Sequence, residues 1–128
     1  EIKQGYGFDY DKRCILAATR ISEIFELPEK FFQVDLNKFE PNVTFPALQN
    51  IPDIVFMFNI GSWVHNWYSL YKKVVETGIP TIVLETNNDR EGKAQLALFK
   101  NLGKTIRFLS TAKDDITGNF RRKVYLIL

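Results

Sequence analysis

A run of five apolar residues, Ile54–Phe58, constrains the fold of this chain more than any other stretch. The run shows no polar alternation, which is typical of a strand covered on both faces within a parallel sheet. Small and polar residues follow it at once, in the segment Asn59–His65. Because open α/β sheets bind ligands at the carboxyl ends of their strands, we expect a ligand to face this end of the strand.

The rest of the chain alternates between helical and strand patterns. Apolar residues at helical spacing predict helices over Asp11–Leu27, over Val64–Val75 with Gly78 as the stop, and from an N-cap at Asp89 to Gly103. Short apolar runs predict strands at Ile2–Phe8, Phe31–Phe39, Ile54–Phe58, Thr81–Leu84, Thr105–Leu109 and Lys123–Leu128. Residues 41–52 read as a loop with at most one turn of helix, and residues 111–122 carry only loop signals.

This order of elements predicts an α/β fold. Strands that alternate with helices form a mostly parallel, open, Rossmann-like sheet with right-handed crossovers and helices on both faces. The last two strands follow one another without a helix, so we expect them to form an antiparallel pair at one edge. A chain of 128 residues, 45% of them hydrophobic, fits a single domain with a real core.

Composition excludes several classes of function. No apolar run approaches the roughly 18 residues that span a bilayer, and there is no secretory leader pattern, so we expect a cytoplasmic protein without a membrane partner. The single cysteine, Cys14, agrees with a reducing compartment. One cysteine and one histidine make no zinc set, so no metal is expected. A net charge of +2 does not indicate a nucleic acid partner.

Four polar residues follow or end successive predicted strands. Asp9, Asp35, Asn59 and Glu85 all stand at carboxyl ends. In a parallel sheet these ends meet, so the fold is expected to bring the four side chains to one edge.

Two segments near the start of the chain, GFDYD and VDLNKF, resemble cofactor motifs of the class I S-adenosylmethionine-dependent methyltransferases. The resemblance implies that Asp9 accepts hydrogen bonds from the cofactor ribose and that Tyr10 packs on the adenine. It also implies that Asp35 takes the adenine amino group, with the Leu36 backbone amide on the ring.

The later segments DIVFMFNIGSWVH and IVLETNN are similar to the fourth and fifth strand motifs of the same family. The resemblance implies that Asn59 faces the methyl donor and that the end of the fifth strand lines the acceptor pocket. S-adenosylmethionine is then the expected cofactor, and the methyl acceptor is unidentified. Where the acceptor must lose a proton, His65 and, less strongly, Glu85 are the candidate bases.

In this family a central strand and a glycine-rich loop come before the segment that matches GFDYD, and the position they would take precedes Glu1. We therefore expect residues 1–128 to form one methyltransferase-like domain that is incomplete at its N-terminus. The strands that begin at Ile2 and Ile54 are then expected to flank the central strand.

Each candidate residue also has a structural interpretation. Asp9 or Asp11 is equally a helix N-cap, and Ser62 is a candidate cap for the helix after the central strand. His65 is a single histidine beside tryptophans and fits a structural role. A non-catalytic binding or interaction module of the same fold is therefore the alternative to an enzyme, and an unrelated nucleotide-binding α/β domain is a third interpretation.

Overall fold

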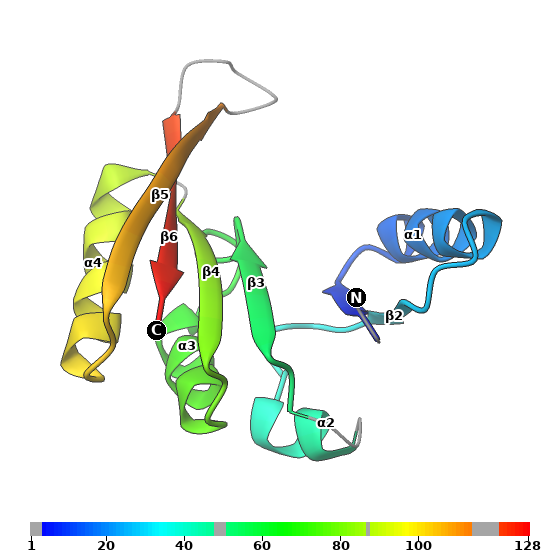
Figure 1. The fold of residues 1–128 in the computed structure, drawn as a ribbon, viewed down its shortest axis with the longest axis horizontal. Coiled ribbons are helices and arrows are strands. Elements are labelled where there is room, and N and C mark those ends of the chain that lie inside the picture. The colour runs from blue at the N-terminus through cyan, green and yellow to red at the C-terminus, as the bar shows by residue number, and fades with distance from the viewer. Residues whose placement is uncertain (1–3, 48–50, 87, 114–120) are drawn as a thin grey trace. The chain divides into compact units, whose positions relative to one another are not determined.

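The computed structural model describes residues 4–47, 51–86, 88–113 and 121–128. The chain divides into two compact units, unit 1 (Glu1–Phe39) and unit 2 (Glu40–Leu128), and each is described by itself (Figure 1).

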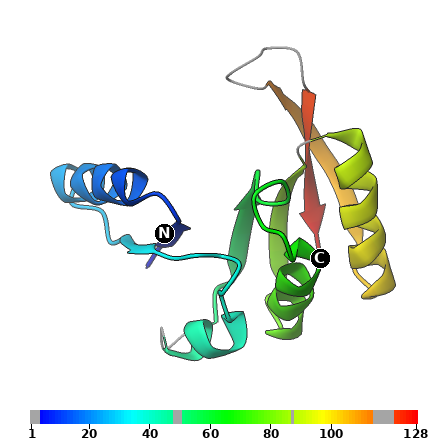
Figure 2. The ribbon, with the colours of Figure 1, turned by 180° about the vertical axis from the view of Figure 1, so that it is seen from behind.

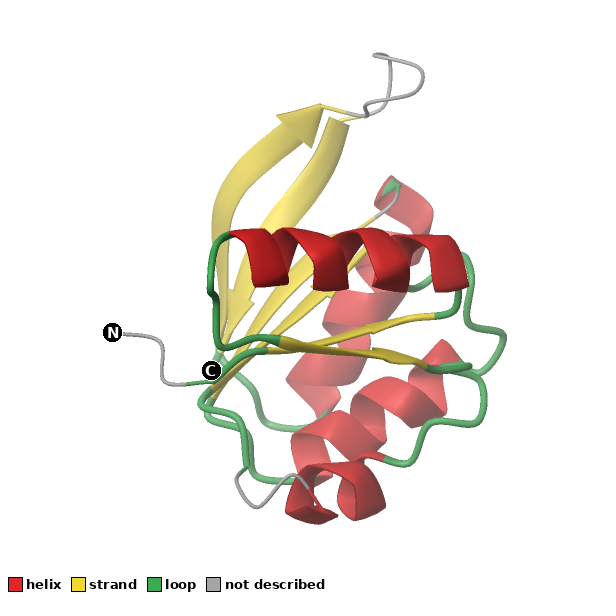
Figure 3. Ribbon diagram, turned by 90° about the vertical axis from the view of Figure 1, so that its right-hand side faces the viewer, coloured by secondary structure: helices red, strands yellow, loops and turns green. Residues whose placement is uncertain are grey.

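Unit 1 is a strand, a helix and a second strand. Its elements are β1 (Tyr6–Asp9), α1 (Lys12–Ile24) and β2 (Lys30–Gln33). The two strands pair in parallel, and α1 lies along the pair (Figure 3). Gly7 of β1 faces Phe31 of β2, and a Cβ at Gly7 would overlap the Phe31 ring. A glycine at this position therefore lets the ring pack directly on the β1 backbone.

The buried face of α1 is much smaller than the predicted apolar stripe. Among the described residues of unit 1, Ser22 alone has a buried side chain. Ile21, Ile24 and Phe25, which belong to the predicted stripe, are exposed. The helix itself is confirmed, but two short strands cover only a narrow part of its apolar face.

Unit 2 is a four-stranded mixed sheet in the order β3-β4-β6-β5. Its elements are α2 (Pro41–Ala47), β3 (Ile54–Phe58), α3 (Trp67–Glu76), β4 (Thr81–Thr86), α4 (Asp89–Asn101), β5 (Ile106–Lys113) and β6 (Arg121–Ile127). The β3–β4 pair is parallel, and β6 runs antiparallel to both β4 and β5. The predicted α/β fold with a terminal antiparallel pair is therefore confirmed.

The core of unit 2 lies between the sheet and two helices. α3 and α4 lie on the same face of the sheet (Figure 2). The most deeply buried hydrophobic side chains there are Met57, Tyr71, Val74, Ile79, Ile82, Leu84, Leu98, Phe99 and Ile127. Phe56 and Phe58 are exposed on either side of Met57, so within unit 2 the expected cover on both faces of β3 is found on one face only.

Glycines end α3 and α4 where the sequence predicts. Gly78 follows α3 with φ 81°, and Gly103 follows α4 with φ 77°. This left-handed backbone is the conformation that glycine adopts at helix ends without steric cost.

The starts of these helices differ from the prediction. Asn66 rather than Ser62 caps α3, through a bond that its side chain accepts from the Ser69 amide. Asn88 rather than Asp89 caps α4 and accepts from the Glu91 amide. In each case the asparagine directly before the first helical residue takes the cap, because its side chain reaches an unpaired amide of the first turn.

Several strand and helix bounds were also predicted wrongly. β2 ends at Gln33, because residues 36–38 form a turn instead of extending the strand. α2 is a helix of seven residues where at most one turn was expected, since Pro41 fits the first position of a helix. β5 and β6 extend into the predicted loop, whose residues 114–120 lie outside the described residues.

Candidate functional site

The carboxyl ends of β1 and β2 are held together in unit 1. The Val34 amide donates to the Asp9 carbonyl at 2.8 Å, and the Gln33 side-chain amide donates to the Tyr10 carbonyl at 3.1 Å. These bonds bring the segment after β2, which carries Asp35, alongside the end of β1. Within unit 1 the structure therefore brings the predicted adenosine-binding residues to one edge.

Asp9 and Asp11 divide the two roles that the sequence left open between them. Asp11 is the N-cap of α1, and its carboxylate accepts from the Arg13 amide at 2.8 Å and pairs with the Arg13 guanidinium at 2.7 Å. These hydrogen bonds from Arg13 lower the pKa of Asp11 to about 2. Asp9 is exposed, and its Oδ1 accepts from the Asp11 amide at 2.7 Å. Asp9 thus orients the turn into α1 through Oδ1, and within the described residues its Oδ2 accepts no hydrogen bond.

Asp35 lies in a turn in which its carboxylate, a hydrogen-bond acceptor, is followed by the Leu36 backbone amide, a donor. Its Oδ1 accepts from the Asn37 backbone amide at 3.0 Å and from the Asn37 side chain at 3.1 Å. These bonds, with the nearby Lys38 charge, lower the pKa of Asp35. Within the described part of the chain, the Leu36 backbone amide donates no hydrogen bond. A carboxylate next to an unused N–H matches the amino group and ring nitrogen of an adenine.

Tyr10 follows β1 with 72% of its surface exposed. An exposed ring has room to stack on a base. The chemistry of Asp9, Tyr10, Asp35 and Leu36 therefore fits the adenosine part of S-adenosylmethionine.

In unit 2 the parallel pairing brings Asn59 and Glu85 to the same edge of the sheet. Phe58 lies opposite Glu85 in the β3–β4 register, and Asn59 follows Phe58 directly. Asn59 has φ 54°, a left-handed conformation that asparagine tolerates better than most residues. Strained residues of this kind concentrate at functional sites.

Glu85 is paired, but its partner is an arginine and not the lysine that the sequence suggested as a partner at the sheet edge. The Arg122 guanidinium of β6 donates to its Oε1 at 2.9 Å, and the side chains of Glu85 and Arg122 are only 13% and 17% exposed. This largely buried ion pair holds the Glu85 carboxylate against β6. No sequence pattern links two residues on strands so far apart in the chain.

His65 is exposed in the loop before α3, one residue ahead of the cap Asn66. The prediction that it lies in the first helical turn is wrong, because α3 begins at Trp67. In the same loop, Ser62 Oγ donates to Glu91 Oε2 at 3.0 Å. The loop of residues 59–66 therefore carries both Asn59 and His65 and contacts α4.

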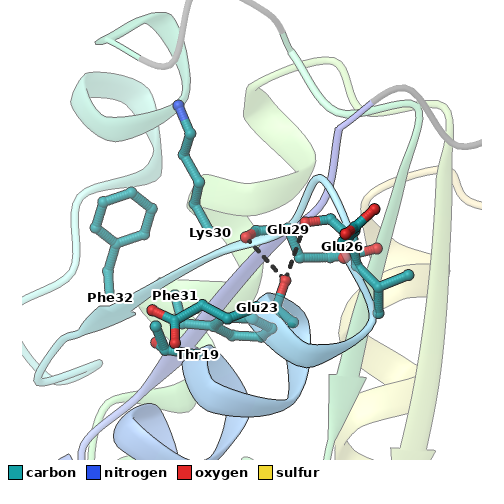
Figure 4. Close-up of a pocket in the computed structure, with 9 residues that line it drawn as sticks. Thr19, Glu23, Glu26, Glu29, Lys30, Phe31 and Phe32 are labelled. Atoms are coloured by element: carbon teal, nitrogen blue, oxygen red, sulfur yellow. Dashed lines mark hydrogen bonds between the residues drawn. The ribbon is translucent and has the colours of Figure 1, made fainter.

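One cavity in unit 1 lies between α1 and β2 (Figure 4). It has a volume of about 440 Å³ and is lined by Thr19, Ser22, Glu23, Glu26, Leu27, Glu29, Lys30, Phe31 and Phe32. The Ser22 hydroxyl donates to the carbonyls of Leu27 and Glu29 at 3.1 and 3.4 Å. None of the predicted site residues lines it, whereas Asp9 lines a second cavity of about 220 Å³ between α1 and β1.

The described residues contain no group of three His, Cys, Asp or Glu side chains that would hold a metal ion. Among the helices of the described segments, none is long and apolar enough to cross a membrane.

Methyltransferases are prominent among the solved structures that share this fold. The methyltransferase domain of bacterial CtHen1-CN superposes with a TM-score of 0.70 at 16% identity, over 98% of this chain and 78% of that chain. Precorrin-6y C5,15-methyltransferase from Geobacter metallireducens GS-15 gives a TM-score of 0.62 at 14% identity, over 95% of this chain and 63% of that chain. EvdMO1 gives 0.71 at 15% identity, over 95% of this chain and 30% of that chain. No protein-family model and no curated protein matches the sequence.

These likenesses show that the chain has the fold of the class I S-adenosylmethionine-dependent methyltransferases. The resemblance predicted from the motifs is thereby confirmed at the level of the fold. The chain spans 30% of the length of EvdMO1 and 78% of the length of the CtHen1-CN domain.

Proposed function

We propose that this chain takes part in S-adenosylmethionine-dependent methyl transfer to an unidentified acceptor. The observation that carries the proposal is the superposition on the CtHen1-CN methyltransferase domain over 98% of the chain. The positions of Asp9 and Asp35 at adjacent strand ends of unit 1 support it.

In unit 1, four groups would hold the adenosine part of the cofactor. Asp9 Oδ2 would accept from the ribose hydroxyls, while Oδ1 stays on the Asp11 amide and fixes the carboxylate. Tyr10 would cover one face of the adenine, and Asp35 and the Leu36 amide would meet its polar edge. A buried hydrogen-bonding group left without a partner costs about 1–3 kcal/mol, so these contacts would discriminate against other nucleosides.

In unit 2, the loop of residues 59–66 would serve the reacting end. Bound S-adenosylmethionine supplies an electrophilic methyl group, so the protein's main task is to hold donor and acceptor in line. Asn59 would orient groups there through its side-chain amide. The exposed His65 would take a proton where the acceptor carries one, and Glu85, held by Arg122, would orient the acceptor.

Titration calorimetry with S-adenosylmethionine and with S-adenosylhomocysteine tests the proposal. We expect both to bind, and we expect Asp9→Asn to weaken binding by about tenfold or more, because the amide keeps Oδ1 for the Asp11 bond and replaces Oδ2. Asp11→Asn is the matched control, since asparagine also caps helices, and it should bind as the parent does. Absence of heat with both ligands would exclude a cofactor site and favour a non-catalytic module. Equal losses in both variants would show that the ribose role is assigned to the wrong aspartate.

A further inference from the structure

Two side chains of α4 contact the loop of residues 59–66. Glu91 accepts from Ser62 Oγ at 3.0 Å. One helical turn further along, the amide of Gln95 occupies the place that a Cβ at Gly61 would take. Because residues one turn apart share a face of a helix, Glu91 and Gln95 contact consecutive residues of this loop.

Gln95 is an unusual residue for the core of unit 2. It is only 1% exposed, and within the described residues its Oε1 has no hydrogen-bond partner. A buried acceptor without a partner destabilises the folded state by about 1–3 kcal/mol, so the burial of Oε1 is not explained by stability. Its contact with Gly61 points to a different role for Gln95, which is to hold the loop in place.

A second buried polar group lies in the same part of unit 2. The Tyr71 hydroxyl is buried, and no partner for it lies in the described segments. Burial and the negative charge of Glu91 raise the pKa of Tyr71. The Glu91 carboxylate therefore lies near the buried Tyr71 side chain as well as against Ser62.

We propose that Gln95 and Glu91 are positioning residues that hold the loop of residues 59–66 in its conformation. This support determines where the loop presents Asn59 and His65, and the consequence for catalysis rests on the proposed function. The support itself follows from the contacts of Gly61 and Ser62. A displacement of about 1 Å in such a loop is enough to reduce a reaction rate by about a hundredfold.

The loop carries its own reporter. Trp63 is 74% exposed within it, whereas Trp67 packs against Tyr71 in α3 with ring centroids 5.5 Å apart. The chain has two tryptophans, so 5-fluorotryptophan labelling gives two fluorine NMR signals, which Trp63→Phe assigns. The Trp67 signal is the internal reference.

Three single variants and one double variant test the support. Ser62→Ala removes the bond to Glu91 at an exposed site, so this variant folds even where Gln95→Ala is poorly stable. Both should shift and broaden the Trp63 signal and leave the Trp67 signal in place. Gly61→Ala should also move the Trp63 signal, and the double variant Gly61→Ala with Gln95→Ala should bring it back toward the parent position, because the new methyl group then has room. Lys93→Ala, an exposed change on the same helix, should move neither signal.

A Trp63 signal unchanged in both Ser62→Ala and Gln95→Ala would overturn the proposal, as would a double variant whose shift is the sum of the two single shifts. Calorimetry with S-adenosylmethionine separates this outcome from the proposed function. A parent chain that binds no cofactor while its Trp63 signal responds as expected contradicts the function and keeps the support. A parent that binds, with a weaker Gln95→Ala variant, agrees with both.

Discussion

The two units of this chain differ in how their helices are covered. In unit 2, α3 buries Leu70, Tyr71 and Val74 against the sheet and α4. In the described part of unit 1, α1 buries only Ser22 and leaves Ile21 exposed, although both helices have a clear apolar stripe. An apolar stripe therefore predicts a helix, but it does not reveal how much of the stripe becomes buried.

The buried core and the predicted adenosine contacts therefore lie in different units of the chain. The core side chains belong almost entirely to unit 2, while Asp9, Tyr10 and Asp35 lie in the thinly packed unit 1. Regions with few buried apolar contacts open at low free energy. We therefore expect unit 1 to open first, and a ligand that binds it to protect it.

The largest effect is expected in the core of unit 2. Phe99 is fully buried and stacks on Tyr71 with ring centroids 5.7 Å apart. Phe99→Ala should lower the free energy of unfolding by about 3–5 kcal/mol in urea denaturation, because it removes a large ring and leaves a cavity. Phe25→Ala in unit 1, at a side chain that is 68% exposed, should change it by less than about 0.5 kcal/mol. Similar losses for the two variants would show that unit 1 has a core of its own.

The next effect concerns one ion pair from each unit. Arg122→Met leaves the largely buried Glu85 carboxylate without this partner and should cost about 1–3 kcal/mol of unfolding free energy. Arg20→Met breaks the exposed pair with Glu23 and should cost less than about 1 kcal/mol. Adding Glu85→Gln to Arg122→Met should recover part of the loss. If the double variant is no more stable than Arg122→Met, then Arg122 stabilises the fold by something other than its ion pair with Glu85.

Helix caps give a smaller effect that again separates the units. Asn88→Ala removes the cap of α4 and should lower the global unfolding free energy by about 1 kcal/mol. Asp11→Ala removes the cap of α1 and should speed amide exchange in α1 while the amides of α4 keep their protection. Loss of protection in both helices after either change would mean that the two units unfold together.

Low pH should weaken the cap of α1 in the same way as the substitution of Asp11. The bonds from Arg13 lower the pKa of Asp11 to about 2 from its ordinary value of 3.8. Since the folded value is the lower one, the charged cap stabilises α1 above about pH 4, and this contribution is lost as the pH falls through about 2. Amide exchange in α1, measured as excess over intrinsic rates, should therefore rise between these values. In Asp11→Asn, which caps without titrating, the acid step in α1 should disappear, and a step that persists would assign it to another group.

Local patterns in the sequence predicted the strands and the helix ends. The apolar run at Ile54–Phe58 and the one that starts at Thr81 form β3 and β4, and the glycines at 78 and 103 end their helices. Each of these features depends on backbone preference and burial within a few residues. The helix starts were harder, because several cap residues compete within one turn, as at Asn88 and Asp89.

The contacts between distant elements were not predictable. Arg122 of β6 pairs with Glu85 of β4, and Gln95 of α4 contacts Gly61 in the loop before α3. In a single sequence an arginine at a strand end, or a glutamine in a helix, looks like a solvated surface residue. Only the fold shows that these two side chains are largely buried against polar loops and strand ends.

Backbone NMR during a titration with S-adenosylhomocysteine tests the central claim most directly. We predict saturable shifts at the amides of Tyr10 and Leu36 in unit 1 and of Asn59 in unit 2, together with slower amide exchange in α1. Asp9→Asn should need a higher ligand concentration for the same shifts. Spectra that stay unchanged up to millimolar ligand, or shifts confined to the cavity around Thr19 and Glu23, would contradict the account.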